Sequence, residues 1–206
     1  GKRKRIAVVG AGIGGLVSAL KLANDGFEVT VFESSDYPGG KIRTIDSSCG
    51  PVNIGPTVLT MLSVFQSLFE QVGENIFDHL ELKEQEILAR HWWSDGTEFD
   101  LLANKDDAFD EVRRVFGANS EKQFIKFCKS TEGMFDCFEK PIMRSSSPAA
   151  LEILKEICNN PKIIPALIPF LTLEKYLKNK FSEPKLQQLF GRYSTYVGGS
   201  PLNSPA

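Results

Sequence analysis

The feature that most constrains the fold of this chain is a glycine cluster that follows directly after an apolar run. The run Ile6–Val9 is continuous, as expected of a parallel strand covered on both faces. Gly10, Gly12 and Gly15 come immediately after it. Helical spacing of apolar residues follows, and then residues 27–32 alternate as in a second strand. Strand, glycine loop, helix and strand within about thirty residues predict one βαβ unit.

This glycine loop predicts a site for the diphosphate of a dinucleotide. Gly10 permits a tight turn off the strand, Gly12 lets the backbone approach the ligand, and Gly15 lets the helix pack against the strand. Amide groups at the helix N-terminus favour negative charge there. The predicted contacts come from the whole loop, which consists of Gly10, Ala11, Gly12, Ile13, Gly14 and Gly15.

Glu33 narrows the choice of dinucleotide. It lies at the end of the second strand, about 20 residues after the loop, where an acid can accept hydrogen bonds from both ribose hydroxyls. The same carboxylate would repel a 2′-phosphate. Glu33 therefore argues against NADP and leaves NAD and FAD.

The segment after Glu33 favours FAD. Residues 36–44 contain the run Gly39-Gly40-Lys41, and they resemble the twin-glycine segment of the flavin amine oxidase and carotenoid desaturase superfamily. The resemblance implies that Gly40, Lys41 and Arg43 lie beside FAD. Two cations near a diphosphate are chemically suited to that place. The alternative for Lys41 and Arg43 is a pair of solvated cations on a loop.

A second segment, residues 49–61, resembles the phytoene desaturase-type segment that passes near the isoalloxazine ring. This resemblance adds Gly55, Pro56, Thr57 and Val58 to the predicted flavin contacts. Asn53 departs from the pattern, because the family often has Asp at this position.

Two distal segments resemble one branch of the carotenoid desaturases. Residues 88–96 (Leu-Ala-Arg-His-Trp-Trp-Ser-Asp-Gly) and residues 189–201 (Leu-Phe-Gly-Arg-Tyr-Ser-Thr-Tyr-Val-Gly-Gly-Ser-Pro) are similar to bacterial hydroxyneurosporene and methoxyneurosporene desaturases. These enzymes act on 1-hydroxylated or 1-methoxylated acyclic carotenoids. The resemblance implies FAD-dependent desaturation by hydride transfer to the flavin, with a hydrophobic carotenoid as substrate.

Three alternatives remain open at this point. One is a phytoene desaturase, and another is a different flavin amine oxidase-type dehydrogenase. The third is a truncated, non-catalytic flavin-binding relic. Family members are longer than this chain, so we expect an N-terminal fragment that binds FAD weakly or not at all and is inactive alone.

The expected fold class is α/β. Residues 1–60 are predicted to form the N-terminal part of a Rossmann-like FAD-binding domain, and residues 61–206 part of a mixed, largely helical substrate domain. We expect an extended stretch over 52–58, broken by Gly55-Pro56, and a hairpin over 87–101, in which Asp95-Gly96 favours a type I′ turn. The predicted helices cover residues 59–72, 106–116, 121–138, 148–158 and 174–181.

Composition excludes several other functions. The net charge of −2 provides no basic field for nucleic acid, and the basic run at residues 2–5 is short and local. The four cysteines show neither a CxxC pair nor metal-ligand spacing, so we expect no metal site and a reducing, cytoplasmic location. Oligomeric state stays undetermined.

The sequence identifies no catalytic residue. His79 and His91 favour surface or core roles, and only one of Trp92 and Trp93 can line a substrate channel because they alternate across a strand. Arg192 and Tyr193 favour a packing and hydrogen-bond role between domains. A face formed by Phe124, Phe127, Phe135 and Phe138 indicates core, although a carotenoid tunnel would need a similar lining.

Residues 163–181 leave two interpretations open. The apolar run 163–172 is too short to span a bilayer and is followed by Lys175, Lys178 and Lys180. One interpretation is a peripheral contact with the inner face of the cytoplasmic membrane. The other is a buried helix with a lysine-bearing solvent face.

Overall fold

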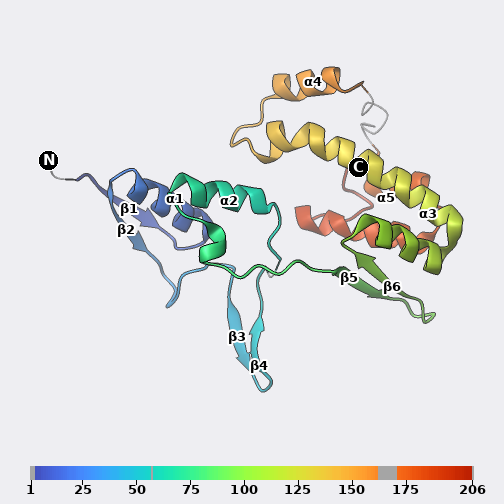
Figure 1. Ribbon diagram of the computed structural model, residues 1–206, viewed down its shortest axis with the longest axis horizontal. Helices are drawn as coiled ribbons and strands as arrows, with labels where there is room; N and C mark the ends of the chain where they lie inside the picture. Colours follow the sequence, from blue (N-terminus) through green and yellow to red (C-terminus); the bar gives the residue numbers. More distant parts are fainter. Residues whose placement is uncertain (1–2, 57, 162–170, 206) are drawn as a thin grey trace. The chain divides into compact units, whose positions relative to one another are not determined.

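The computed structural model describes residues 3–56, 58–161 and 171–205, which form two compact units (Figure 1). The first unit is Gly1–Lys83 and the second is Glu84–Ala206. The predicted functional division, with residues 1–60 for the cofactor and 61–206 for the substrate, concerns ligands and stays a prediction. The two units are described separately below.

The first unit begins with the predicted βαβ element. Its parts are β1 (Arg5–Val9), α1 (Ile13–Asn24) and β2 (Glu28–Phe32). The two strands pair in parallel over their whole length. Helix α1 ends before Gly26, whose φ of 89° lies in the left-handed region that favours glycine after a helix. The expected α/β, Rossmann-like fold is confirmed for this part of the chain.

The rest of the first unit is a hairpin followed by short helices. Its elements are β3 (Thr44–Ser47), β4 (Gly50–Asn53), α2 (Leu62–Gln71) and the 3₁₀ turn η1 (Ile76–Asp78). The helix predicted over 59–72 is confirmed with a later start. The stretch predicted over 52–58 pairs as a strand up to Asn53, and the predicted break at Gly55 and Pro56 follows. Proline has no N–H to donate to a strand ladder.

The second unit is a hairpin covered by helices. Its elements are β5 (Ile87–Trp92), β6 (Glu98–Leu102), α3 (Lys105–Phe138), the π-helical turn η2 (Glu139–Met143), α4 (Ala150–Asn159), α5 (Leu173–Lys180), α6 (Pro184–Gly191) and the 3₁₀ turn η4 (Arg192–Val197). Non-helical backbone at Gly117 divides α3 into the two helices that the sequence predicts. The predicted helices do not include α6, which begins with Pro184 after the N-capping side chain of Glu183.

The hairpin turn differs from the expected type I′ geometry. Gly96 has a φ of 83°, but no other residue of the turn has a positive φ, and type I′ requires two in succession. The Gly96 N–H donates to the Trp93 carbonyl (3.0 Å), and the Thr97 N–H donates to the Asp95 carboxylate (3.0 Å). The Asp95 side chain therefore stabilises a turn in which Asp95 keeps ordinary backbone angles.

One hydrophobic core holds the second unit together. It is formed by side chains of β6, α3, α5 and α6, together with Phe181, which directly follows α5. Its members are Phe99, Leu101, Ala108, Val112, Phe124, Tyr176, Leu177, Phe181, Leu186 and Leu189. Phe124 is buried and Phe127 packs against this core, as predicted for the phenylalanine face. Phe135 does not follow the prediction, because it is 45% exposed.

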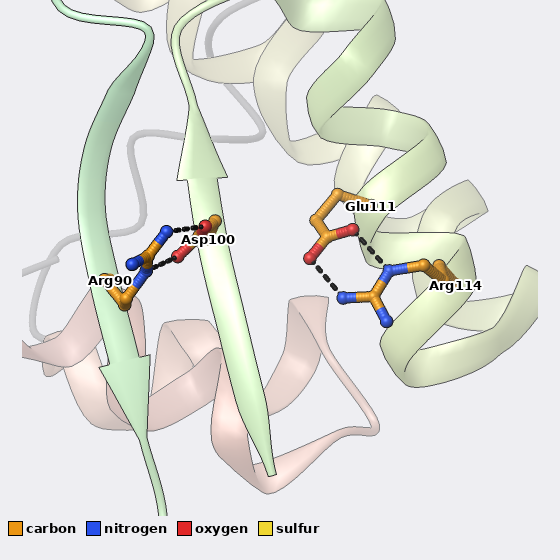
Figure 2. A network of polar contacts seen from close by, with 4 residues as sticks. All are labelled: Arg90, Asp100, Glu111 and Arg114. Carbon is orange, nitrogen blue, oxygen red and sulfur yellow. Dashed lines mark hydrogen bonds and ion pairs between the residues drawn. The ribbon is translucent and has the colours of Figure 1, made fainter.

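The hairpin and α3 each carry an arginine paired with a carboxylate (Figure 2). Arg90 on β5 donates two hydrogen bonds of 2.7 Å to Asp100, its cross-strand partner on β6. On α3, Arg114 donates two of 2.6 Å to Glu111. These bonds lower the pKa of Asp100 and of Glu111, so both carboxylates stay ionised at neutral pH.

Candidate cofactor site

The glycine loop between β1 and α1 is fixed to both of its neighbours. The Gly10 N–H donates to the Phe32 carbonyl (2.7 Å), which ties the end of β1 to the end of β2. At Gly15, an added Cβ would lie 1.9 Å from the Gly10 carbonyl oxygen. Only glycine at this position allows α1 to approach the loop so closely. Gly12 is the N-cap of α1, so the first turn of the helix has no side-chain cap.

Glu33 lies against this loop, directly after β2. Its Oε2 accepts a hydrogen bond from the Ala11 N–H (2.7 Å), and its Oε1 accepts from the Ser35 N–H (2.9 Å) and the Ser34 hydroxyl (3.2 Å). The Ser35 and Ala11 amides lower the pKa of Glu33 to about 2. Glu33 is therefore a carboxylate at neutral pH. Because each carboxylate oxygen has two lone pairs, Oε2 keeps acceptor capacity for a ribose hydroxyl.

The twin-glycine segment, between β2 and β3, lies against this glycine loop. The Gly39 N–H donates to the Ala11 carbonyl (2.8 Å). A Cβ added at Gly40 would lie 3.1 Å from the Gly12 Cα, and Gly40 has a φ of 61°. Gly12 and Gly40 lie more than twenty-five residues apart in the sequence, and the fold brings their backbones into contact.

The segment around Gly55 lies against the residues that follow the twin glycines. A Cβ at Gly55 would lie 1.9 Å from the Lys41 carbonyl oxygen, and the Ile54 N–H donates to the Arg43 carbonyl (3.0 Å). A surface pocket of about 310 Å³ opens beside this contact. Its lining consists of Tyr37, Ile42, Arg43, Thr44 and Asn53.

The predicted cofactor residues thus gather in one place, with three qualifications. Pro56 and Val58 are exposed, and Val58 is 68% exposed. Thr57 lies outside the described residues. The side chains of Lys41 and Arg43 are exposed, and within the described ranges neither forms an ion pair.

Sequence reasoning missed part of this site. Ser34 and Ser35 donate to Glu33, and Tyr37 and Asn53 line the pocket. Two short polar residues directly after a strand-terminal acid are a usable signal, because such residues readily form tight turns with local hydrogen bonds. The pocket had no local signal, because its members come from three separate segments.

The other residues considered in the sequence belong elsewhere. His79 Nε2 lies 3.0 Å from Glu74 Oε2 on the surface of the first unit. In the second unit, His91 Nε2 lies 3.2 Å from Arg192 Nη1. Trp92 is 64% exposed, whereas the indole N–H of Trp93 donates to Gln188 (2.7 Å). The two tryptophans therefore face opposite sides, as their alternation predicted.

Two observations on the described residues concern metal sites and membrane-spanning helices. Among them, no group of three or more His, Cys, Asp or Glu side chains is arranged to hold a metal ion. Nor does any helix in the ranges 3–56, 58–161 and 171–205 combine the length and apolarity needed to cross a bilayer. Most of the apolar run 163–172 lies outside the described residues.

Comparisons with known proteins give this geometry a context. Residues 8–73 match the family described as NAD(P)-binding Rossmann-like domain, which covers the loop, Glu33, the twin glycines and Gly55. The chain is 43% identical over 98% of its length to hydroxyneurosporene desaturase from Cereibacter sphaeroides, and 39% identical over 98% to that from Rhodobacter capsulatus. The chain is similar to hydroxyneurosporene desaturases along almost all its length. The resemblance predicted from the distal segments is confirmed.

More distant relatives agree with this assignment. The chain is 32% identical over 98% of its length to 1-hydroxycarotenoid 3,4-desaturase from a Flavobacterium species. It spans about two fifths (41%) of the length of each of these three desaturases. Among solved structures, wild-type putrescine oxidase bound to putrescine matches with a TM-score of 0.54 at 20% identity, over 99% of this chain and 38% of that one. At this identity the match supports the fold alone.

Proposed function

We propose that the chain is part of an FAD-dependent oxidoreductase that desaturates an acyclic carotenoid carrying a 1-hydroxy or 1-methoxy group. The observation that carries the proposal is the 39–43% identity to hydroxyneurosporene desaturases over 98% of the chain. The dinucleotide site of the first unit supports it, because its geometry suits a cofactor with a diphosphate and an unphosphorylated ribose.

The residues present fit FAD. The amides of the first turn of α1 have no side-chain cap and suit a diphosphate, while Gly12 and Gly40 leave backbone without side chains beside it. Lys41 and Arg43 add two cations without ion pairs in the described ranges. Glu33, ionised and partly saturated with hydrogen bonds, would hold the adenosine ribose.

Desaturation removes a hydride from one allylic carbon and a proton from its neighbour. FAD held by the residues of this chain would supply the hydride acceptor, and oxygen or a quinone would supply the final electron acceptor. The residues of this chain bind and orient the cofactor through the glycine loop, Glu33 and the segments around Gly40 and Gly55. The predicted contacts of Pro56, Thr57 and Val58 with the isoalloxazine ring are part of this proposal.

The matching family is described by NAD(P), so the cofactor needs a direct test. Equilibrium titrations of the intact gene product with FAD, NAD and NADP would separate them. We expect binding of FAD only, and weaker FAD binding in a Glu33→Gln variant, because the amide cannot replace an ionised acceptor of two ribose hydroxyls. Preferential binding of NAD would contradict the assignment of FAD.

Activity has its own test. The purified intact gene product should show a flavin spectrum, and anaerobic addition of a 1-hydroxylated acyclic carotenoid should bleach it. A folded flavoprotein that no carotenoid bleaches would contradict the proposal and would favour the non-catalytic relic. Bleaching by an amine instead would favour an amine oxidase.

We also propose that the protein contacts the inner face of the cytoplasmic membrane peripherally through the region that includes α5. Tyr176 and Leu177 on α5 are buried, Lys178 pairs with Glu174 (2.7 Å), and the described residues give Lys175 no ion pair. A Lys175/Lys178/Lys180→Glu variant should float less with anionic liposomes than the wild type does. Unchanged flotation would contradict the electrostatic contact and favour a helix with a solvated lysine face.

A further inference from the structure

The second unit contains an arginine that has no carboxylate partner among the described residues. Arg192 is the first residue of η4 and is exposed. Its Nη1 lies 3.2 Å from His91 Nε2, and its guanidinium carbon lies 5.2 Å from the centre of the Tyr193 ring. Within the described residues it has no carboxylate within ion-pair distance. Arg90 and Arg114 of the same unit, by contrast, are each bound to a carboxylate through two hydrogen bonds (Figure 2).

His91 holds Arg192 without neutralising it. Burial, and then the positive charge of Arg192, lower the pKa of His91, so the imidazole is neutral at neutral pH. With the proton on Nδ1, its Nε2 accepts one N–H of the guanidinium. Arginine carries five N–H groups, so this contact fixes the side chain and leaves other donors available. The ring of His91 is itself positioned by near-parallel stacking on Trp93 (5.9 Å between centres).

Arg192 lines a pocket with walls of mixed character. The pocket has a volume of about 290 Å³ and lies entirely within the second unit. Leu177, Pro184 and Pro201 supply apolar surface, and Gln188 and Arg192 supply polar groups. Glu174 and Lys178 also line it, and they neutralise each other (2.7 Å). Arg192 is therefore the one cation of the lining, within the described residues, that has no ion pair.

This combination suits a ligand that is apolar along its length and carries a neutral oxygen. The apolar walls favour hydrocarbon, and the guanidinium can donate to a hydroxyl or ether oxygen. A hydrogen bond from a charged donor contributes about 1.5–3 kcal/mol, which is about 10- to 150-fold in affinity.

We propose that Arg192, held by His91, binds the oxygen on carbon 1 of the carotenoid and thereby distinguishes an oxygenated carotenoid from the same polyene without oxygen. This inference rests on the proposed function. Apolar walls alone cannot distinguish the oxygenated end of a polyene from hydrocarbon. One hydrogen bond from the guanidinium to the oxygen on carbon 1 makes that distinction.

The test compares two substrates that differ only in the 1-hydroxyl group. For the intact gene product, kcat/KM and equilibrium binding are measured with each polyene, the latter by quenching of protein fluorescence. The variants are Arg192→Met and Arg192→Lys. Arg113→Met is the matched control, because Arg113 is an exposed arginine on α3 outside the pocket lining.

We expect the wild type to prefer the hydroxylated polyene and the Arg192→Met variant to lose about 10- to 100-fold of that preference. Its loss of kcat/KM should be greater with the hydroxylated polyene than with the non-hydroxylated one. Arg192→Lys should lose part of the preference, because a single ammonium lacks the forked donors. If Arg192→Met does not fold, the Arg192→Lys variant still tests whether Arg192 recognises the hydroxyl group. Arg113→Met should match the wild type.

Two results would overturn the inference. One is an unchanged preference in both Arg192 variants, and the other is an equal loss of rate with both polyenes, which would indicate a purely structural role. If the wild type desaturates neither polyene, the proposed function fails, and the binding measurements then decide the role of Arg192. Binding that does not depend on the hydroxyl group, or no binding of either polyene, would count against recognition of the hydroxyl group by Arg192.

Discussion

The contact between Gly15 and Gly10 supports a quantitative prediction about the first turn of α1. In a Gly15→Ala variant, the new Cβ would meet the Gly10 carbonyl oxygen at 1.9 Å, whereas ordinary contact begins at 3.4 Å. The oxygen cannot simply retreat, because the Gly10 N–H is bonded to the Phe32 carbonyl (2.7 Å). Helix α1 must therefore move away from the loop by more than 1 Å, which would separate its first turn from the glycine backbone around it.

Gly14 is the matched control for this change. It is the preceding residue of α1, and a Cβ added there would meet nothing within 4 Å. Both substitutions gain the same helix propensity, about 1 kcal/mol for Gly→Ala. Only Gly15→Ala adds the overpacking cost, typically about 1–3 kcal/mol. We therefore expect the local stability of α1 in the two variants to differ by about 1–3 kcal/mol, or about 5- to 150-fold in exchange rate.

The measurement is amide hydrogen exchange followed by mass spectrometry, on the intact gene product without cofactor. Trp92 and Trp93 both belong to the second unit, so their fluorescence would not report on α1. Peptides from residues 10–33 report the change, and peptides from the hairpin of the second unit serve as an internal reference. If Gly15→Ala protects α1 as well as Gly14→Ala does, the close contact does not govern the packing of this helix.

Three further predictions concern single polar groups. Glu33 should titrate near 2 by NMR, compared with 4.5 for an ordinary glutamate. The stability that Glu33 contributes is therefore present above about pH 4.5 and is lost as the pH falls towards 2. A titration midpoint near 4.5 would refute this prediction. The Asn104 side chain accepts the Asp106 and Asp107 N–H groups in the first turn of α3. Asn104→Ala should therefore destabilise the start of this helix by about 1 kcal/mol, measured by hydrogen exchange. Unchanged exchange would contradict the cap. Replacing Arg90 by Met should raise the pKa of Asp100 towards 3.8 and lower the midpoint of urea unfolding only slightly, because the pair is partly exposed; a large loss would mean that the pair does more than stabilise the hairpin.

The sequence predicts the first unit well because its signals are local. Gly10, Gly12 and Gly15 stand within six residues, and each has a steric reason to be glycine that holds in almost any protein with this loop. The strands on either side have the apolar patterns that parallel pairing needs. The family resemblance places Gly40 near the cofactor, but the contact of Gly40 with Gly12 could not be obtained from the spacing of residues.

Irregular backbone limits prediction within both units. The extended stretch expected over 52–58, with its break at Gly55-Pro56, pairs as a strand only up to Asn53, and the turn at Asp95 takes a different geometry from the one that Asp-Gly favours. In the turn a single local interaction decides the outcome. At Asp95 this is the hydrogen bond that its side chain accepts from the Thr97 N–H, which competes with the backbone preference.

The second unit shows where sequence reasoning loses resolution, and Arg192 is the clearest case. His91 and Arg192 are 101 positions apart, and each was considered separately as a surface or packing residue. The feature that distinguishes Arg192 is the absence of a carboxylate partner among the described residues, and no pattern of residue types along a chain reveals whether a charge is paired. Arg90, Arg114 and Arg192 look alike in sequence, but hydrogen bonds to Asp100 and Glu111 neutralise the first two. Residue identity thus limits what chemistry is available, and three-dimensional pairing decides which of these cations is left to bind a ligand.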